Sequence, residues 1–164
     1  MDFSSAADEL YGVAPAEFVA ARTRLARRAK DEGDGALARR IAALRRPTAP
    51  AWAVNLLARS APGDLAALLD VGARLRAAWG SGDDLSDLEQ RRARLVADLV
   101  RTASGLAAGA GAPLRDPAVR EVEDTLQAAT VDAGTAEEVE GLGHRLRLPD
   151  HAFGDALLAL QHAA

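Results

Sequence analysis

Apolar residues in this chain recur at intervals of three and four positions, and this spacing most limits the folds that the chain can adopt. Phe18, Ala21, Leu25 and Ala29 follow it, which places them on one face of an α-helix. Residues that favour β-strands are scarce, with one isoleucine, ten valines and six threonines among 164 residues. The sequence therefore predicts an all-α fold, an irregular bundle of roughly seven to nine antiparallel helices.

Proline, glycine and capping residues indicate where these helices begin. Ser86 with Glu89, and Thr135 with Glu138, have the spacing of capping boxes, in which each member accepts a hydrogen bond at the start of a helix. The nine expected helices begin near Ser5, Pro15, Leu37, Pro50, Asp64, Ser86, Pro117, Thr135 and Asp150.

Two of the expected helices have apolar stripes that make specific predictions. In the fifth, Leu68, Gly72, Leu75 and Trp79 recur at i, i+4, i+7 and i+11, so the pattern predicts that Trp79 belongs to the core. Trp52, in the fourth, is predicted to be a core residue as well. The stripe predicted for the sixth consists of Leu88, Leu95, Leu99, Thr102 and Leu106.

The length of the chain suits a single helical domain, residues 1–164. Charge is distributed unevenly along it. The formal net charge is −4 at pH 7, yet residues 1–60 carry +3 and residues 61–164 carry −7. We therefore expect a basic N-terminal part, 1–60, on an acidic remainder, 61–164.

No residue pattern indicates an enzyme, a metal site or a cofactor site. The chain has no cysteine, and Pro149 separates the three histidines, 144, 151 and 162, so that one helix cannot present them together. No nucleophile stands beside a base, and no glycine pair is followed by the Gly-Lys-Ser/Thr of a phosphate-binding loop. Because no apolar run approaches the roughly 18 residues of a membrane span, and the N-terminus lacks a signal-peptide pattern, cytoplasm is the expected location.

A cluster of basic residues between residues 22 and 46 is the first candidate for function. Arginines there could neutralise phosphates and give salt-sensitive binding of nucleic acid. The alternative is a solvated face that pairs with the acidic half or with a partner helix. A helix-turn-helix over residues 36–59 is disfavoured, because the connection from Leu44 to Pro50 is long and the following helix is apolar nearly all round. The candidate surface comprises Arg24, Arg27, Arg28, Arg39, Arg40, Arg45, Arg46 and Asn55.

Asn55 joins this set because it is the only asparagine and lies within that apolar helix. Its amide could bind a ligand, a base edge or the backbone of a partner. The alternative is a hydrogen bond from its amide to a loop carbonyl, such as one in the turn at residues 46–48.

Residues 8–59 contain a set of short motifs: Leu10–Tyr11–Gly12, Pro15, Glu17–Phe18, Arg22, Leu25, Gly33–Asp34, Leu44–Arg45–Arg46–Pro47, Ala51–Trp52 and Val54–Asn55. Together they resemble a family of uncharacterised proteins from GC-rich actinobacteria. A second landmark of that family lies at residues 143–146 and 153–154. The resemblance implies that a charged, alanine-rich helical extension follows this domain in a longer protein, and it implies no activity, substrate or catalytic residue.

These observations favour a non-catalytic helical module that binds another protein or its own C-terminal extension, with no cofactor and no membrane partner. The alternative is a nucleic-acid-binding domain that uses the basic residues of its second and third helices.

Overall fold

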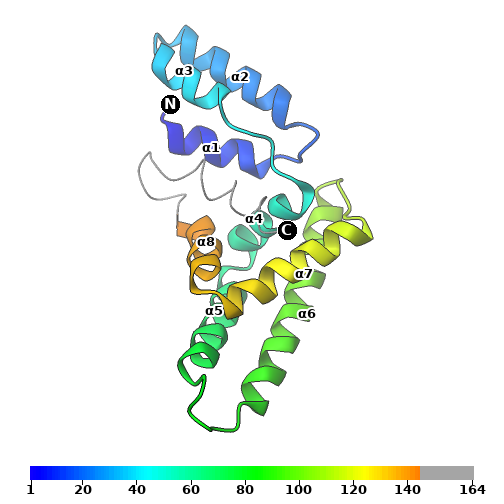
Figure 1. The fold of residues 1–164 in the computed structure, drawn as a ribbon. Helices are drawn as coiled ribbons and strands as arrows, with labels where there is room; N and C mark the ends of the chain where they lie inside the picture. The colour runs from blue at the N-terminus through cyan, green and yellow to red at the C-terminus, as the bar shows by residue number, and fades with distance from the viewer. Residues whose placement is uncertain (145–164) are drawn as a thin grey trace. The chain divides into compact units, whose positions relative to one another are not determined.

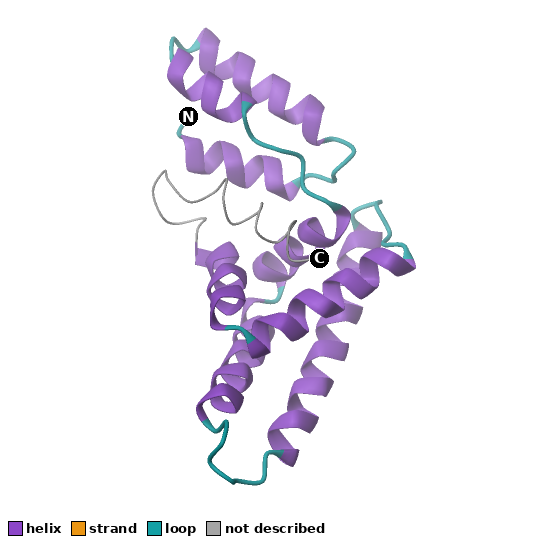
Figure 2. Cartoon of the chain, in the orientation of Figure 1, coloured by secondary structure: helices purple, strands orange, loops and turns teal. Residues whose placement is uncertain are grey.

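A computed structural model describes residues 1–144, and every regular element in this range is an α-helix (Figures 1 and 2). The predicted all-α class and the predicted number of helices are confirmed. The helix expected from Asp150 lies outside the described residues. The eight helices within the described range are α1 (Phe3–Gly12), α2 (Phe18–Asp31), α3 (Gly35–Ala42), α4 (Ala49–Ser60), α5 (Pro62–Ala77), α6 (Ser86–Gly109), α7 (Asp116–Val131) and α8 (Ala133–His144).

The described residues divide into two compact units, one formed by residues 1–52 with residue 144 and the other by residues 53–143. Helix α4 begins in the first unit and ends in the second. The change of charge expected after residue 60 falls at the C-terminal end of α4. The expected single domain stays a prediction.

In the first unit, α1, α2 and α3 pack on one another. The stripe predicted for α2 is confirmed, because Phe18, Ala21, Leu25 and Ala29 are all buried. The helix itself begins at Phe18 rather than near Pro15, since residues 15–17 form a turn. Gly33, with φ 87°, ends α2 and lets α3 return along it.

Side chains of α1 and α2 fix the chain that leaves α3. The Arg22 guanidinium donates a hydrogen bond to the carbonyl oxygen of Leu44 at 2.6 Å, and the Tyr11 hydroxyl donates one to that of Arg45 at 3.4 Å. Phe18 lies between these two side chains, with its ring centroid 5.4 Å from that of Tyr11 and 5.9 Å from the Arg22 guanidinium carbon. Residues 44–46 are therefore held by contacts far apart in sequence.

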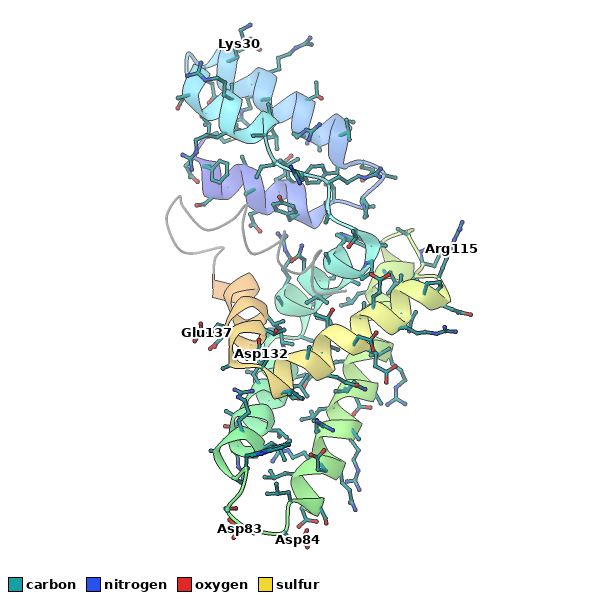
Figure 3. All side chains as sticks on the ribbon, viewed as in Figure 1. Lys30, Asp83, Asp84, Arg115, Asp132 and Glu137 are labelled. Atoms are coloured by element: carbon teal, nitrogen blue, oxygen red, sulfur yellow. The ribbon has the colours of Figure 1, made fainter. Side chains whose placement is uncertain are left out.

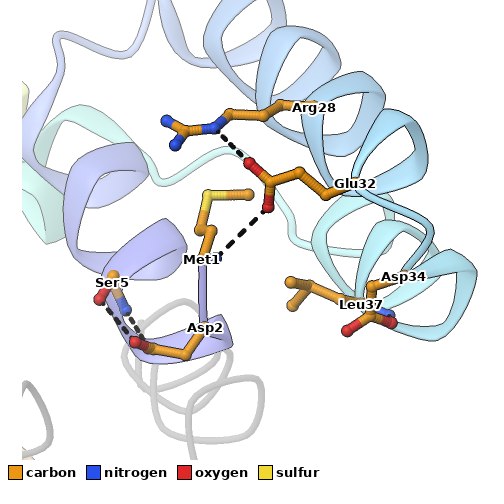
Figure 4. Close-up of polar contacts among 7 residues, drawn as sticks. All are labelled: Met1, Asp2, Ser5, Arg28, Glu32, Asp34 and Leu37. Atoms are coloured by element: carbon orange, nitrogen blue, oxygen red, sulfur yellow. Dashed lines mark hydrogen bonds and ion pairs between the residues drawn. The ribbon is translucent and has the colours of Figure 1, made fainter.

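Carboxylates cap two helices of this unit, α1 and α3 (Figure 4). Asp2 accepts hydrogen bonds from the backbone N–H and hydroxyl of Ser5 at the start of α1, and Asp34 accepts one from the N–H of Leu37 at the start of α3. Each cap satisfies an amide that has no partner within its own helix.

In the second unit, α5 and α6 form an antiparallel hairpin and α7 crosses it (Figure 1). The crossing is close because Gly72 of α5 faces the backbone of Thr130 in α7: a Cβ added to Gly72 would lie 2.6 Å from the Thr130 Cα. One turn further along α5, the Arg76 guanidinium donates to the carbonyl oxygens of Ala129 and Thr130 at 3.3 and 3.0 Å. The side chain thus satisfies carbonyls at the C-terminal end of α7.

Both predicted capping boxes are wrong in their chemistry, although helices begin close to them. At α6, Asp84 accepts hydrogen bonds from the backbone N–H and the hydroxyl of Ser86. At α8, Asp132 accepts them from the N–H and the hydroxyl of Thr135. An aspartate two or three residues earlier competes successfully for the serine or threonine, because a carboxylate is the stronger acceptor.

Two stripe predictions also need correction. Trp79 is not a core residue, because it lies beyond the last residue of α5 and is 84% exposed. In α6 the buried residues are Val96, Leu99, Ala103 and Ala107, whereas Leu88, Leu95, Thr102 and Leu106 are half-buried. The buried face of α6 therefore combines Val96 and Leu99 with two alanines, and of the predicted stripe only Leu99 is buried.

Candidate interaction surfaces

The candidate arginines of α2 and α3 differ in how the fold uses them. Arg24 forms an ion pair with Glu9 at 2.5 Å, and Arg28 forms one with Glu32 at 2.8 Å (Figure 4 shows the second). Arg40 lies over the ring of Phe3, with its guanidinium carbon 4.1 Å from the ring centroid. These three side chains are therefore engaged within the first unit.

Four other arginines of the predicted surface are exposed, and within the described residues their side chains make no ion pair or hydrogen bond. Arg27 and Arg39 each lie two positions from a buried residue, so they point away from the packed faces of their helices. We call these four residues the arginine set: Arg27, Arg39, Arg45 and Arg46.

Helix α4 lacks the short connection and the exposed face of a recognition helix. Six residues, 43–48, connect it to α3, which is longer than the turn of a helix-turn-helix. Its residues 51–55 are all buried, as expected for a core helix.

Asn55 is only 5% exposed, which places it in the interior rather than on a surface with the arginines. Its amide nitrogen has no acceptor among the described residues, and neither has the indole nitrogen of Trp52, one turn earlier in α4. The hydrogen bond to the 46–48 turn that the sequence allowed is therefore absent from the described structure. Buried donors usually have partners, so both groups are unusual.

The turn between α5 and α6 contains Trp79, which the sequence pattern predicted to lie in the core. We call residues 79–84 the hairpin tip, which Figure 3 marks by Asp83 and Asp84 at the end of the α5–α6 hairpin. Every residue of the tip is exposed, including Trp79 at 84%. The helical spacing suggested that Trp79 continues the α5 stripe, but α5 stops at Ala77 and the turn carries the ring out of register.

Local hydrogen bonds give the hairpin tip a defined shape. Gly80 and Gly82 both have φ 79°, a left-handed conformation that favours glycine. The Ser81 hydroxyl donates to Asp83 at 2.8 Å, and the Asp83 N–H donates back to that hydroxyl at 3.2 Å. The hydroxyl and N–H of Ser86 lower the pKa of Asp84, so this carboxylate is charged at neutral pH.

The tip therefore combines an exposed indole with carboxylates. Residues 79–89 hold four aspartates or glutamates and no basic residue. Tryptophan is a large, rigid side chain that often dominates the energy of a protein interface. This part of the chain can offer an apolar anchor with acidic neighbours to a partner.

Neither a metal-holding group nor a membrane-spanning helix is found in the described part of the chain. It contains no group of three or more histidine, cysteine, aspartate or glutamate side chains placed to hold a metal ion. Nor does it contain a helix with the length and apolar character needed to cross a membrane.

Comparison with known proteins gives no relative. No protein-family model matches the chain, and no match is found among the curated proteins or the solved structures. The resemblance of residues 8–59 to an actinobacterial family remains a prediction.

Proposed function

We propose that this chain is a non-catalytic helical interaction module that binds another protein through its hairpin tip. The observation that carries this proposal is the exposure of Trp79, 84% of which is open to solvent in a turn fixed by hydrogen bonds. An indole in this position costs solubility, and burying it against a partner would recover about 25 cal/mol per Å² of apolar area. The C-terminal extension implied by the resemblance is a second candidate ligand for the same surface.

Site-specific photo-crosslinking in the source organism tests the proposal. A photoreactive phenylalanine analogue replaces Trp79 in the full-length protein, and matched samples carry it at Val19 or Val131, which are also exposed. We expect one protein to be crosslinked from position 79 and not from the two valine positions. Absence of a crosslink specific to position 79 would contradict the proposal.

A second candidate function is nucleic-acid binding, and the arginine set is what favours it. Four exposed arginines without partners in the described structure could contact phosphates. Neutralising about four phosphates predicts that affinity falls roughly 100-fold between about 50 and about 200 mM salt. Fluorescence anisotropy with labelled duplex DNA and RNA measures this, and no binding at the lower salt concentration would exclude this function.

The matched variants replace arginines by glutamine in two sets of equal charge. One set is Arg27, Arg39, Arg45 and Arg46; the control set is Arg74, Arg94, Arg115 and Arg120, which are exposed in the second unit. Nucleic-acid binding through the arginine set requires that the first variant loses binding and the second keeps most of it.

A further inference from the structure

The hairpin tip and the arginine set are complementary in charge and in chemistry, although they belong to different units of the chain. The hairpin tip, residues 79–84, holds two aspartates and no basic residue, whereas the arginine set holds four arginines. A guanidinium also stacks favourably on an indole, so arginines suit Trp79 as well as they suit Asp83 and Asp84.

Both surfaces are available for such a contact. The side chains of the arginine set make no ion pair within the described residues, even though Arg24 and Arg28 beside them do. At the tip, Asp83 and Asp84 each use one carboxylate oxygen in the turn, where they accept hydrogen bonds from Ser81 and Ser86. Their second oxygens make no hydrogen bond among the described residues.

We infer that the protein partner of the hairpin tip is a second copy of this chain, whose arginine set receives Trp79, Asp83 and Asp84. This inference rests on the proposed function and names its partner. The choice of a second copy follows from charge complementarity, because the chain itself carries the basic surface that an acidic, aromatic tip needs. The tip and the arginine set are different surfaces, so the contact is head to tail and leaves one of each free for a further copy.

Sedimentation velocity of the full-length protein, over a range of concentrations, gives the first test. At about 0.01 M salt, where the Debye length is about 30 Å, we expect the mass to rise with concentration beyond that of a dimer. At about 0.15 M salt the Debye length is about 8 Å, so the association is weaker. A monomer at every concentration in low salt overturns the inference.

Two variants distinguish this contact from other kinds of self-association. The tip variant carries W79A, D83N and D84N; asparagine keeps an acceptor oxygen for the bonds of the turn. The set variant carries R27Q, R39Q, R45Q and R46Q. Each alone should be monomeric, with association at least about 30-fold weaker than wild type, because each removes one of the two surfaces.

Mixing the two variants supplies one intact tip and one intact arginine set. We expect a heterodimer of one copy of each that grows no further, because neither surface is left to continue the chain. Circular dichroism of each variant confirms that it is folded. The D70N/D124N control, which removes two exposed carboxylates elsewhere in the second unit, should associate like wild type.

The remaining outcomes are decisive. Association of either variant alone, or a mixture that stays monomeric, overturns the inference. Nucleic-acid binding that depends on the arginine set of a monomeric protein also overturns it. If the protein is monomeric while position 79 crosslinks to a different protein, the second-copy partner is wrong and the proposed function stands. If the protein neither associates nor gives a crosslink from position 79, both the second-copy inference and the proposed function are wrong.

Discussion

Tyr11 is buried beside Phe18, and its hydroxyl donates to the carbonyl oxygen of Arg45. Burial raises the pKa of Tyr11 to about 12, with the charge of Arg22 acting in the opposite direction. The phenolate is disfavoured because it would lose hydration that the protein does not replace. This side chain is therefore a reporter for the packing of α1, α2 and residues 44–46.

Tyr11 is the only tyrosine, so its ionisation can be followed by ultraviolet absorbance without interference from another phenol. We expect a midpoint near pH 12 in the folded protein and near 10 in denaturant. Because the folded pKa is the higher one, its contribution to stability is complete below pH 10 and is lost as pH rises towards 12. A folded-state midpoint near 10 would show that Tyr11 is not buried.

Replacing a buried polar residue usually destabilises a protein, but for Asn55 we predict the opposite. Replacing it by alanine removes a donor without an acceptor in the described structure and improves helix propensity in α4. We expect Asn55→Ala to leave the free energy of unfolding unchanged or to raise it by up to ~1 kcal/mol. Urea denaturation measures the difference.

Leu57→Ala is the control, because Leu57 is fully buried in the same helix and lacks any polar group. It should lower the free energy of unfolding by ~2–5 kcal/mol. A loss of ~1–3 kcal/mol for Asn55→Ala would instead mean that the amide is satisfied in the folded protein.

At the scale of elements, the crossing of α5 and α7 depends on Gly72. A methyl group at this position would overlap the backbone of Thr130, which cannot move without displacing α7 and the carbonyls that Arg76 binds. We expect Gly72→Ala to lower the free energy of unfolding by ~1–3 kcal/mol, although alanine is the better helix former. Thermal and urea denaturation both measure this loss.

Gly105 provides the matched control, since it lies inside α6 and nothing lies within 4 Å of an added Cβ. Gly105→Ala should raise stability by ~0.5–1 kcal/mol through helix propensity alone. Equal effects of the two substitutions would mean that α5 and α7 do not approach closely at Gly72.

Helix ends show why local motifs were only partly informative. Ser86 and Thr135 were correctly identified as residues near helix starts, yet Asp84 and Asp132 are the acceptors there. The two hydroxyls donate hydrogen bonds to these carboxylates, whereas a capping box requires them to accept hydrogen bonds from backbone amides of the helix. In the case of Asp132, the N–H and hydroxyl of Thr135 lower the carboxyl pKa, so acid would weaken this cap.

At the scale of the whole molecule, exposed ion pairs contribute little to stability. The pairs in the described structure include the N-terminal amine–Glu32, Arg24–Glu9, Arg28–Glu32, Arg92–Glu89 and Arg101–Asp98, and the more exposed member of each of these is at least 40% open to solvent. Solvent and salt both screen such pairs. Buried leucines and alanines hold each unit together, and the first unit has buried aromatic rings as well.

Raising the salt concentration from about 0.1 to about 1 M should therefore change the free energy of unfolding by less than ~1 kcal/mol. Urea denaturation at both salt concentrations checks this expectation, with protein dilute enough to be monomeric. A decrease of several kcal/mol in the free energy of unfolding would show that ion pairs make a major contribution to stability. Association through the hairpin tip, in contrast, should weaken over the same range.

The sequence by itself determined the helical class, the number of helices and the buried stripe of α2, because helical periodicity and turn residues are local properties of the chain. It also located the basic residues of α2 and α3. Only the tertiary structure decided which arginines are paired, that Asn55 is buried without an acceptor, and which residues of α6 are buried. Those outcomes depend on contacts between residues far apart in sequence.

Trp79 shows the same division most clearly. Its spacing from Leu68, Gly72 and Leu75 is helical, so Trp79 would lie on the same face as these residues if α5 extended that far. The structure ends α5 at Ala77, where Gly80 and Gly82 turn the chain towards α6, and the indole therefore lies in solvent. Periodicity predicts the side of a helix on which a residue lies, but only the packed structure determines where the helix stops and whether a neighbour covers that side.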